Sequence, residues 1–217
     1  MKDKHILRRQ ADRGSYDFAS AAAVLDAGFV CHVGLVQDGE PVVIPMLYAR
    51  DGERLLLHGS VASRLLRELS GGIPVCVTVT HLDGMVLAAS VFDHSANYRS
   101  VVVFGRARLI EDSQKKARIF DQMVEFMIPG RTQDARPANR KEANATTVLE
   151  LPIETFSVKQ RAGPAGPLGK DDPEDVWTGV IPLTTTPGKP ETEQDPGRIP
   201  GYVSAWRPDA GRLEDGD

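Results

Sequence analysis

The chain has 217 residues, of which 41% are hydrophobic and 26% are charged, and these are ordinary values for a globular protein. Its formal net charge of −4 at pH 7 argues against general binding to nucleic acid, which needs a basic surface. No apolar stretch approaches the roughly 20 residues of a membrane span, so we expect a cytoplasmic protein with neither a nucleic-acid nor a membrane partner.

The first 60 residues predict a polar arm, a short helix and three strands. Residues 1–16 form the arm, and Asp17 is a suitable N-cap for a helix that ends before Gly28. Asp-Gly pairs, which favour tight hairpins, separate strands expected at 30–36, 41–48 and 54–59. Pro45 indicates that the second strand is an edge or is bent, because proline cannot donate to a ladder.

A helix is expected directly after the third strand. Ser60 is its natural N-cap, and Gly71-Gly72 ends it. A helix N-terminus exposes unpaired N–H groups and a partial positive charge, to which Ser60 and Ser63 add hydroxyls and Arg64 adds a guanidinium. The segment is therefore a candidate phosphate site, and simple capping beside a surface arginine is the alternative.

The chain up to residue 160 predicts further short strands and one more helix. The helix begins at residue 112 or 113 and is stopped by Pro129-Gly130. Gly105 interrupts an apolar run and predicts a bulge or a close backbone contact. The strands are expected at 75–80, 85–92, 101–110, 146–151 and 155–160. Six to eight strands with few helices predict a mainly β protein, an antiparallel barrel with flanking helices.

Hydrogen-bonding side chains are concentrated between residues 94 and 100, just before the apolar run 101–110. They include Tyr98, Arg99 and Ser100. Because they lie at the mouth of a core strand, they are candidates to hold a small polar ligand. A solvated hairpin is the alternative.

Composition divides the chain into three parts. We expect an N-terminal arm over 1–16, a barrel domain over 17–162 and a Pro- and Gly-rich extension over 163–217. Within the extension only residues 176–183 are expected to pack, and 184–217 are expected to be extended or disordered. Tyr202 and Trp206 are candidates to dock on the body or on a partner subunit.

The sequence carries no motif for a protein nucleophile or a bound metal. Its five histidines lack metal-ligand spacing, and Cys31 and Cys76 lie in apolar runs that favour buried thiols over a disulfide. A nucleophile elbow, a Walker phosphate loop and a dinucleotide fingerprint are all missing. We therefore expect a cofactor to carry any chemistry.

Several strings resemble the flavin-binding split-barrel superfamily, and within it the pyridoxamine-phosphate-oxidase-related group that includes Nim-type nitroimidazole reductases. The resemblance covers roughly residues 10–160. The strings are Leu57-His58-Gly59-Ser60, Ser63-Arg64, the run 82–88 and the long run 94–107, which contains Asn97-Tyr98-Arg99-Ser100-Val101-Val102.

The resemblance implies a six-stranded Greek-key split barrel and a homodimer with a flavin, FMN or alternatively FAD, at its interface. Carried over by position, the flavin phosphate would contact Ser60, Ser63 and Arg64. The flavin ring would lie along Val43, Ile44, Pro45 and Met46. Tyr98, Arg99 and Ser100 would contribute to the same cleft, and His58 would lie beside the ring. His58 and Tyr98 are thereby the candidate catalytic residues, as proton donors, and no metal site is implied.

The resemblance therefore implies an FMN-dependent oxidoreductase that reduces a small electrophile such as a nitro-compound or a quinone. The C-terminal segment does not match the end by which true pyridoxamine-phosphate oxidases hold their substrate, so oxidation of vitamin B6 is not implied. Two alternatives remain: a flavin carrier or sensor without turnover, and a split barrel that binds haem or a deazaflavin coenzyme.

Overall fold

The computed structural model of the protein describes residues 4–208. The strands are β1 (Gly14–Ser15), β2 (Val30–Gln37), β3 (Glu40–Asp51), β4 (Arg54–Ser60), β5 (Pro74–Leu87), β6 (Ser95–Arg106), β7 (Arg108–Leu109), β8 (Thr146–Pro152), β9 (Thr155–Arg161) and β10 (Gly179–Pro182). The α-helices are α1 (Phe18–Asp26), α2 (Arg64–Ser70), α3 (Ser113–Met127), α4 (Arg140–Asn144) and α5 (Gly201–Ser204), and the 3₁₀ turns are η1 (Ala11–Arg13), η2 (Val91–Asp93), η3 (Arg131–Gln133) and η4 (Pro196–Arg198). Within the described residues, no helix is both long and apolar enough to cross a membrane.

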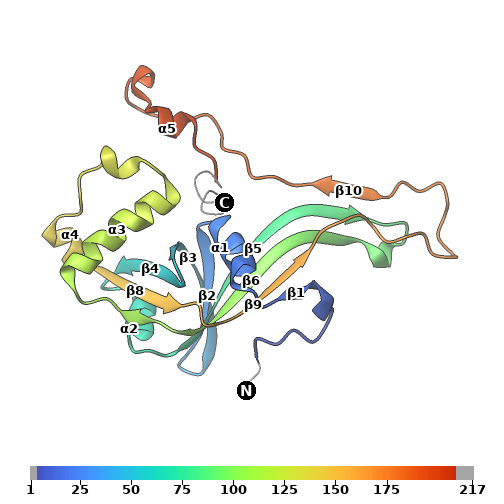
Figure 1. The fold of residues 1–217 in the computed structure, drawn as a ribbon, viewed down its shortest axis with the longest axis horizontal. Helices are drawn as coiled ribbons and strands as arrows, with labels where there is room; N and C mark the ends of the chain where they lie inside the picture. Colours follow the sequence, from blue (N-terminus) through green and yellow to red (C-terminus); the bar gives the residue numbers. More distant parts are fainter. Residues whose placement is uncertain (1–3, 209–217) are drawn as a thin grey trace.

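The strands form one curled antiparallel sheet with helices at its flanks. Its order is β1-β9-β6-β5-β2-β3-β4-β8-β7, and β10 pairs with β5 outside this path. Figure 1 shows α3 and α4 beside β4 and β8, and a long β5–β6 hairpin that extends away from them. The mainly β fold class, a half-barrel with flanking helices, is confirmed, and the described chain has ten strands where the sequence predicts six to eight.

Apolar side chains of β4 alternate between its two faces, and both faces are packed. This alternation determines on which face His58 lies. Leu55 and Leu57 join a large core that also contains Leu25 and Tyr48, whereas Leu56 packs with Ile119 and Met123 of α3 in a second cluster. Successive side chains of a strand point to opposite faces. His58 therefore follows Leu56 onto the face that α3 covers.

The Asp83-Gly84 pair is not a turn, which corrects the expectation of separate strands at 75–80 and 85–92. β5 runs through it as one strand that pairs with β6, with a register shift between Leu82 and Gly84. Arg99 of β6 holds the Asp83 carboxylate with two hydrogen bonds of 3.0 and 2.8 Å, and this cross-strand pair stabilises the bulge in the ladder. The reversal lies instead after β5, at η2, so the polar residues before residue 101 already belong to β6.

The helix after β4 begins later than the sequence predicts. Ser63, not Ser60, is the N-cap of α2, and its hydroxyl accepts a hydrogen bond from the Leu66 amide. Ser60 is held in β4 by pairing with Thr146, and its hydroxyl accepts from the Ala62 amide. Ladder pairing to β8 therefore prevails over the capping preference of Ser60.

One other local prediction is confirmed, and a second is corrected. Residues 40–47 of β3 pair with β2, and β3 meets β4 only from Tyr48 onward, so Pro45 lies in an edge segment as expected. At Gly105 the chains do approach closely, but the neighbour is a side chain and not the expected backbone, since an added Cβ would lie 2.8 Å from Leu151 Cδ1.

The C-terminal extension packs against the body in two places. β10 lies within the predicted packing segment 176–183 and pairs with Gly84–Leu87 of β5. Farther along, Trp206 donates to the Met127 carbonyl at 2.8 Å, so this side chain docks on the body of its own chain. The last nine residues of the expected extended tail, 209–217, lie outside the described residues.

Gly105→Val is expected to lower the free energy of unfolding by about 1–3 kcal/mol, because the added methyl groups overpack a fully buried leucine. Gly166→Val is the matched control, since nothing lies within 4 Å of a Cβ at that position. Urea denaturation of both variants measures the difference. Equal midpoints for the two variants would contradict the close approach of β6 to Leu151.

Candidate functional site

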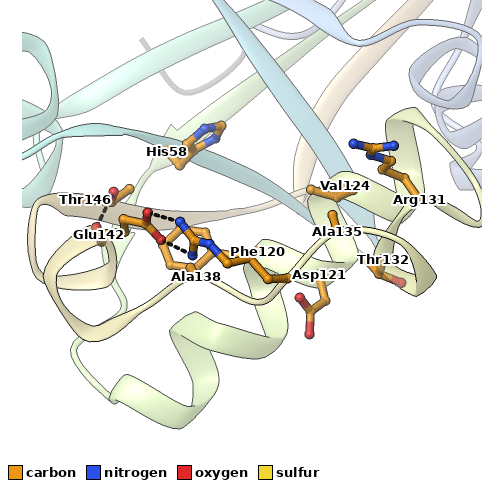
Figure 2. Close-up of a pocket in the computed structure, with 11 residues that line it drawn as sticks. His58, Phe120, Asp121, Val124, Arg131, Thr132, Ala135, Ala138, Glu142 and Thr146 are labelled. Carbon is orange, nitrogen blue, oxygen red and sulfur yellow. Dashed lines mark hydrogen bonds and ion pairs between the residues drawn. The ribbon is translucent and has the colours of Figure 1, made fainter. Parts of the chain in front are cut away.

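A cavity of about 580 Å³ lies between β4, α3 and the loops that carry η3 and precede α4. Figure 2 shows His58 above Phe120 and Ala138, with Arg131 and Thr132 toward one end and Glu142 and Thr146 toward the other. Phe120 and Val124 come from α3, and the polar side chains come mainly from the loop after it. The cavity therefore has an apolar floor and a polar rim that carries two arginines, two carboxylates (Asp121 and Glu142) and hydroxyl groups.

His58 is the histidine of this cavity, and its environment favours the neutral imidazole. Its Nδ1 is buried and has no hydrogen-bond partner among the described residues. Burial lowers the pKa of His58 below its ordinary value of 6.5, because the charged ring is poorly solvated. A neutral imidazole with an unsatisfied buried nitrogen is suited to bind a metal-containing group, whereas the lowered pKa disfavours its protonation.

The rim loop is braced from α3 by Glu125. The Glu125 carboxylate accepts hydrogen bonds from the Gly130 amide at 2.6 Å and the Thr132 amide at 2.8 Å. The Thr132 hydroxyl also donates to Glu125, and this bond lowers the pKa of the carboxyl. The turn that begins at Gly130, where φ is +87°, is thereby fixed to the helix that forms the cavity floor.

The two arginines of the cavity differ in their partners. Arg136 forms two hydrogen bonds to Glu142, of 2.6 and 2.9 Å, and the pKa of Glu142 falls to about 2 because of this pair. Arg131 instead donates to the Tyr202 hydroxyl at 3.0 Å, and among the described residues it has no carboxylate within ion-pair distance. Arg131 is therefore the cation with more capacity for an anionic ligand.

The structure brings a second group of predicted site residues together near the β2–β3 turn. Val43, Ile44 and Pro45 are exposed on the edge segment of β3. Arg64, the first residue of α2, forms an ion pair with Asp38 of that turn, and both side chains are exposed. Met46 packs against the large core, so it contributes less surface than its neighbours.

A third group lies elsewhere in the chain. Arg99 is committed to Asp83, the Ser100 hydroxyl donates to the Lys159 carbonyl at 3.0 Å, and Tyr98 pairs across the sheet with Leu82 and Arg161. Seven residues of β6, or about 23 Å of strand, separate Arg99 from Arg106, whose guanidinium reaches Gly72 just after α2. A single chain therefore does not gather Tyr98, Arg99 and Ser100 with Ser63 and Arg64.

A comparison against models of protein families identifies the relationship of this chain. The model described as pyridoxamine 5'-phosphate oxidase matches residues 17–160. The chain belongs to the pyridoxamine 5'-phosphate oxidase-like family.

Among solved structures of this family, the flavocytochrome Anf3 from Azotobacter vinelandii matches with 36% identity and a TM-score of 0.86, over 94% of this chain and 97% of that chain. A FAD- and haem-binding protein from Mycobacterium smegmatis matches with 37% identity and a TM-score of 0.84, over 89% and 96% of the two chains. A protein described as a 5-nitroimidazole antibiotic resistance protein from Bacteroides thetaiotaomicron, at 20% identity and a TM-score of 0.55 over 67% and 85%, shows the shared fold alone. A comparison with curated sequences found no match.

Sequence reasoning missed the arginines at the rim of the cavity in this family member. Arg131 and Arg136 follow the predicted helix stop at Pro129-Gly130, Phe120 lies on the helix before it, and none of the three is among the predicted site residues. The available signal was the density of arginine after a helix stop at Pro129-Gly130. Spacing alone does not show that this loop folds back over His58.

The free energy of unfolding of the protein without added ligand is expected to fall as pH drops below 6.5. Unfolded His58 takes up a proton at its ordinary pKa, while the folded residue resists until a lower pH, so the unfolded state binds more protons in that window. One titrating group contributes a slope of at most about 1.4 kcal/mol per pH unit, and the slope from the half-buried His58 should stay below that limit because solvent screens its charge. Urea denaturation from pH 8 to pH 5 should show this slope, and His58→Gln should remove it. An unchanged slope in the variant would assign the effect to other groups.

Proposed function

We propose that this protein is a redox protein of the flavocytochrome type, which binds FAD and a haem group. Two solved structures at 36% and 37% identity, described as a flavocytochrome and as a FAD- and haem-binding protein, match nearly the whole chain and support this assignment. The observation in the chain itself that carries the proposal is His58, whose buried Nδ1 has no hydrogen-bond partner among the described residues and whose pKa is lowered by burial, in a cavity with an apolar floor and arginines at its rim.

The cavity residues fit a haem. A volume of about 580 Å³ lies within the usual range for pockets that bury an organic ligand. His58 would be the iron ligand, Phe120 and Val124 would contact the apolar macrocycle, and Arg131 would face a propionate. When bound, haem would supply one-electron chemistry, and the residue that ligates its iron would tune its reduction potential. The protein's own part would be to keep His58 deprotonated and to shield it from water.

The edge of β3 and the start of α2 support a flavin nucleotide. The backbone of Val43–Met46 has groups that no neighbouring strand uses, and Arg64 and Ser63 would contact a phosphate, as would Ser60. FAD replaces the FMN of the sequence-based prediction in this proposal, because one of the two matches is described as a FAD- and haem-binding protein and the other as a flavocytochrome. When bound, a flavin would supply one- or two-electron chemistry.

A second copy of the chain is part of the proposal. Several apolar side chains of β2 and β3 are exposed in the single chain, including Val36 at 65% and Val43 at 62%. An apolar surface of this kind on a sheet edge is typical of an interface. A homodimer would cover it, and Tyr98, Arg99 and Ser100 of one protomer would complete the flavin cleft of the other.

Other parts of the sequence-based hypothesis stay predictions. They are the reduction of a nitro-compound or quinone, proton donation by His58 or Tyr98, a flavin carrier or sensor without turnover, a deazaflavin coenzyme, and a cytoplasmic location. We also propose that residues 17–162 are the cofactor-binding unit and that 163–217 are an extension of it.

Extraction and mass spectrometry of the cofactors from purified protein test the proposal directly. FAD and iron protoporphyrin should both be recovered. The purified protein should show flavin absorbance at about 450 nm and a haem Soret band at about 410 nm. Recovery of flavin alone, from protein that also fails to take up added haemin, would favour the flavin-only oxidoreductase. A colourless protein that takes up neither cofactor would overturn the proposal.

A further inference from the structure

The last described segment of the chain lies against the loop that forms the cavity rim. The Trp206 indole donates to the carbonyl of Met127, the final residue of α3, at 2.8 Å. A carbonyl at a helix C-terminus has no partner within its own helix, so this bond satisfies a group that would otherwise need water. The Trp206 ring also lies 5.8 Å from the ring of Phe29, centroid to centroid, which fixes the segment to the body.

Tyr202, one turn earlier, contacts the rim itself. Its hydroxyl donates to Asp134 at 2.8 Å and accepts from Arg131 at 3.0 Å. Its ring packs on Gly130, where an added Cβ would lie 3.6 Å from the tyrosine Cγ. The Tyr202 hydroxyl therefore stands between a cation that lines the cavity and an anion that does not.

This arrangement has an electrostatic consequence. The hydrogen bond to Tyr202 is the main cause of the raised pKa of Arg131, and the attraction of Asp134 adds a smaller contribution. With the tyrosine hydroxyl between them, the guanidinium has a fixed neutral acceptor and keeps its charge available to the cavity. Without the hydroxyl, a direct Arg131–Asp134 pair would form and would neutralise the cation at the rim.

We infer that Tyr202 and Trp206 are positioning residues, which hold Arg131 and the rim of residues 127–135 in place for the anionic edge of a ligand bound beside His58. The C-terminal extension is thereby part of the binding site, although it does not line the cavity near His58. This inference rests on the proposed function for the nature of the ligand. The placement of the rim by Tyr202 and Trp206 can be measured without any ligand.

The first arm of the test measures charge recognition with haemin and with haemin dimethyl ester, which lacks the propionate charges. Wild-type protein should prefer haemin by about tenfold or more, and Tyr202→Phe should reduce this preference about three- to tenfold. Asp134→Asn added to Tyr202→Phe should restore it, because the competing carboxylate is gone. Trp177→Phe, a change at an exposed ring of the same extension, is the control. An undiminished preference in Tyr202→Phe would overturn the inference.

The second arm measures hydrogen exchange of the amides of residues 128–135 without haemin. Exchange should be faster in a Tyr202→Phe, Trp206→Phe double variant than in Trp177→Phe, and equal rates would overturn the placement of the rim by these side chains. If wild-type protein takes up neither porphyrin, the proposed function fails, and faster exchange in the double variant would then still support the positioning role. The two failures are thus distinguishable.

Discussion

His58→Ala is expected to weaken haemin binding on the order of 100-fold or more and to remove the spectrum of the ligated haem. His58 lines the cavity near β4 and α3, and within residues 4–208 its buried Nδ1 has no partner that would compete with a ligand. Loss of a group that merely orients a metal ligand lowers affinity 10- to 100-fold, so loss of the ligand itself should exceed that range. Titration of the purified protein with haemin, followed at the Soret band, gives the affinity.

His5→Ala is the matched control, because His5 also has a buried Nδ1 without a partner but lies on the N-terminal arm, where its ring contacts Tyr16. It should bind haemin like the wild type. His58→Gly supplemented with imidazole should regain the ligated spectrum, since the free base can enter the space of the missing side chain. Unchanged affinity and spectrum in His58→Ala would exclude this histidine as the ligand.

Arg64→Ala is expected to weaken the binding of FAD and FMN about 10- to 100-fold while changing riboflavin binding little, because a charge-assisted hydrogen bond to phosphate is lost. The guanidinium is at the first residue of α2, beside the Ser63 cap, and it already binds an anion, the Asp38 carboxylate. Fluorescence titration with the three flavins measures the difference. Equal loss for riboflavin would contradict a phosphate site at this position.

Two further variants sharpen the assignment of the phosphate site. Arg67→Ala removes an exposed arginine from the same helix and should leave all three affinities unchanged. Asp38→Asn should strengthen FAD and FMN binding by a few fold, because it frees Arg64 from an exposed ion pair that contributes little stability. A weaker affinity in Asp38→Asn would mean that the carboxylate orients the guanidinium rather than competing for it.

Local sequence rules predicted much of the fold. They failed where pairing between strands far apart in sequence determined the secondary structure of a segment. Asp17 caps α1, Gly39 and Gly52 turn with positive φ, and Pro45 lies on an edge, each as its residue type requires. Asp83-Gly84 carries the same dipeptide signal as the true turns. It stays in a strand because Arg99 and the long β5–β6 ladder bind it, and no local rule contains that information.

The residues of the candidate site differ in the same way, because some could be predicted from local sequence and others could not. His58 and Arg64 were found because they lie in strings that the family carries, close together in sequence. Arg131 was missed because its role depends on three distant groups, namely β4 beneath it, Glu125 of α3 beside it and Tyr202 of the C-terminal extension behind it. Loop residues acquire such roles only when the chain has folded.

The pairing of β10 with β5 also limits edge-to-edge pairing of strands between two copies of the protein. The far half of the β5–β6 hairpin leaves the main sheet, and β2 pairs with β5 only at residues 76–78. Without β10, the backbone N–H and C=O groups of Gly84–Leu87 would form an open edge able to pair with the same edge of another molecule. Gly84 admits β10 at close range, since a Cβ there would lie 3.0 Å from the Ile181 carbonyl. The extension thus covers this edge of β5, and a chain cut after residue 162 would expose it.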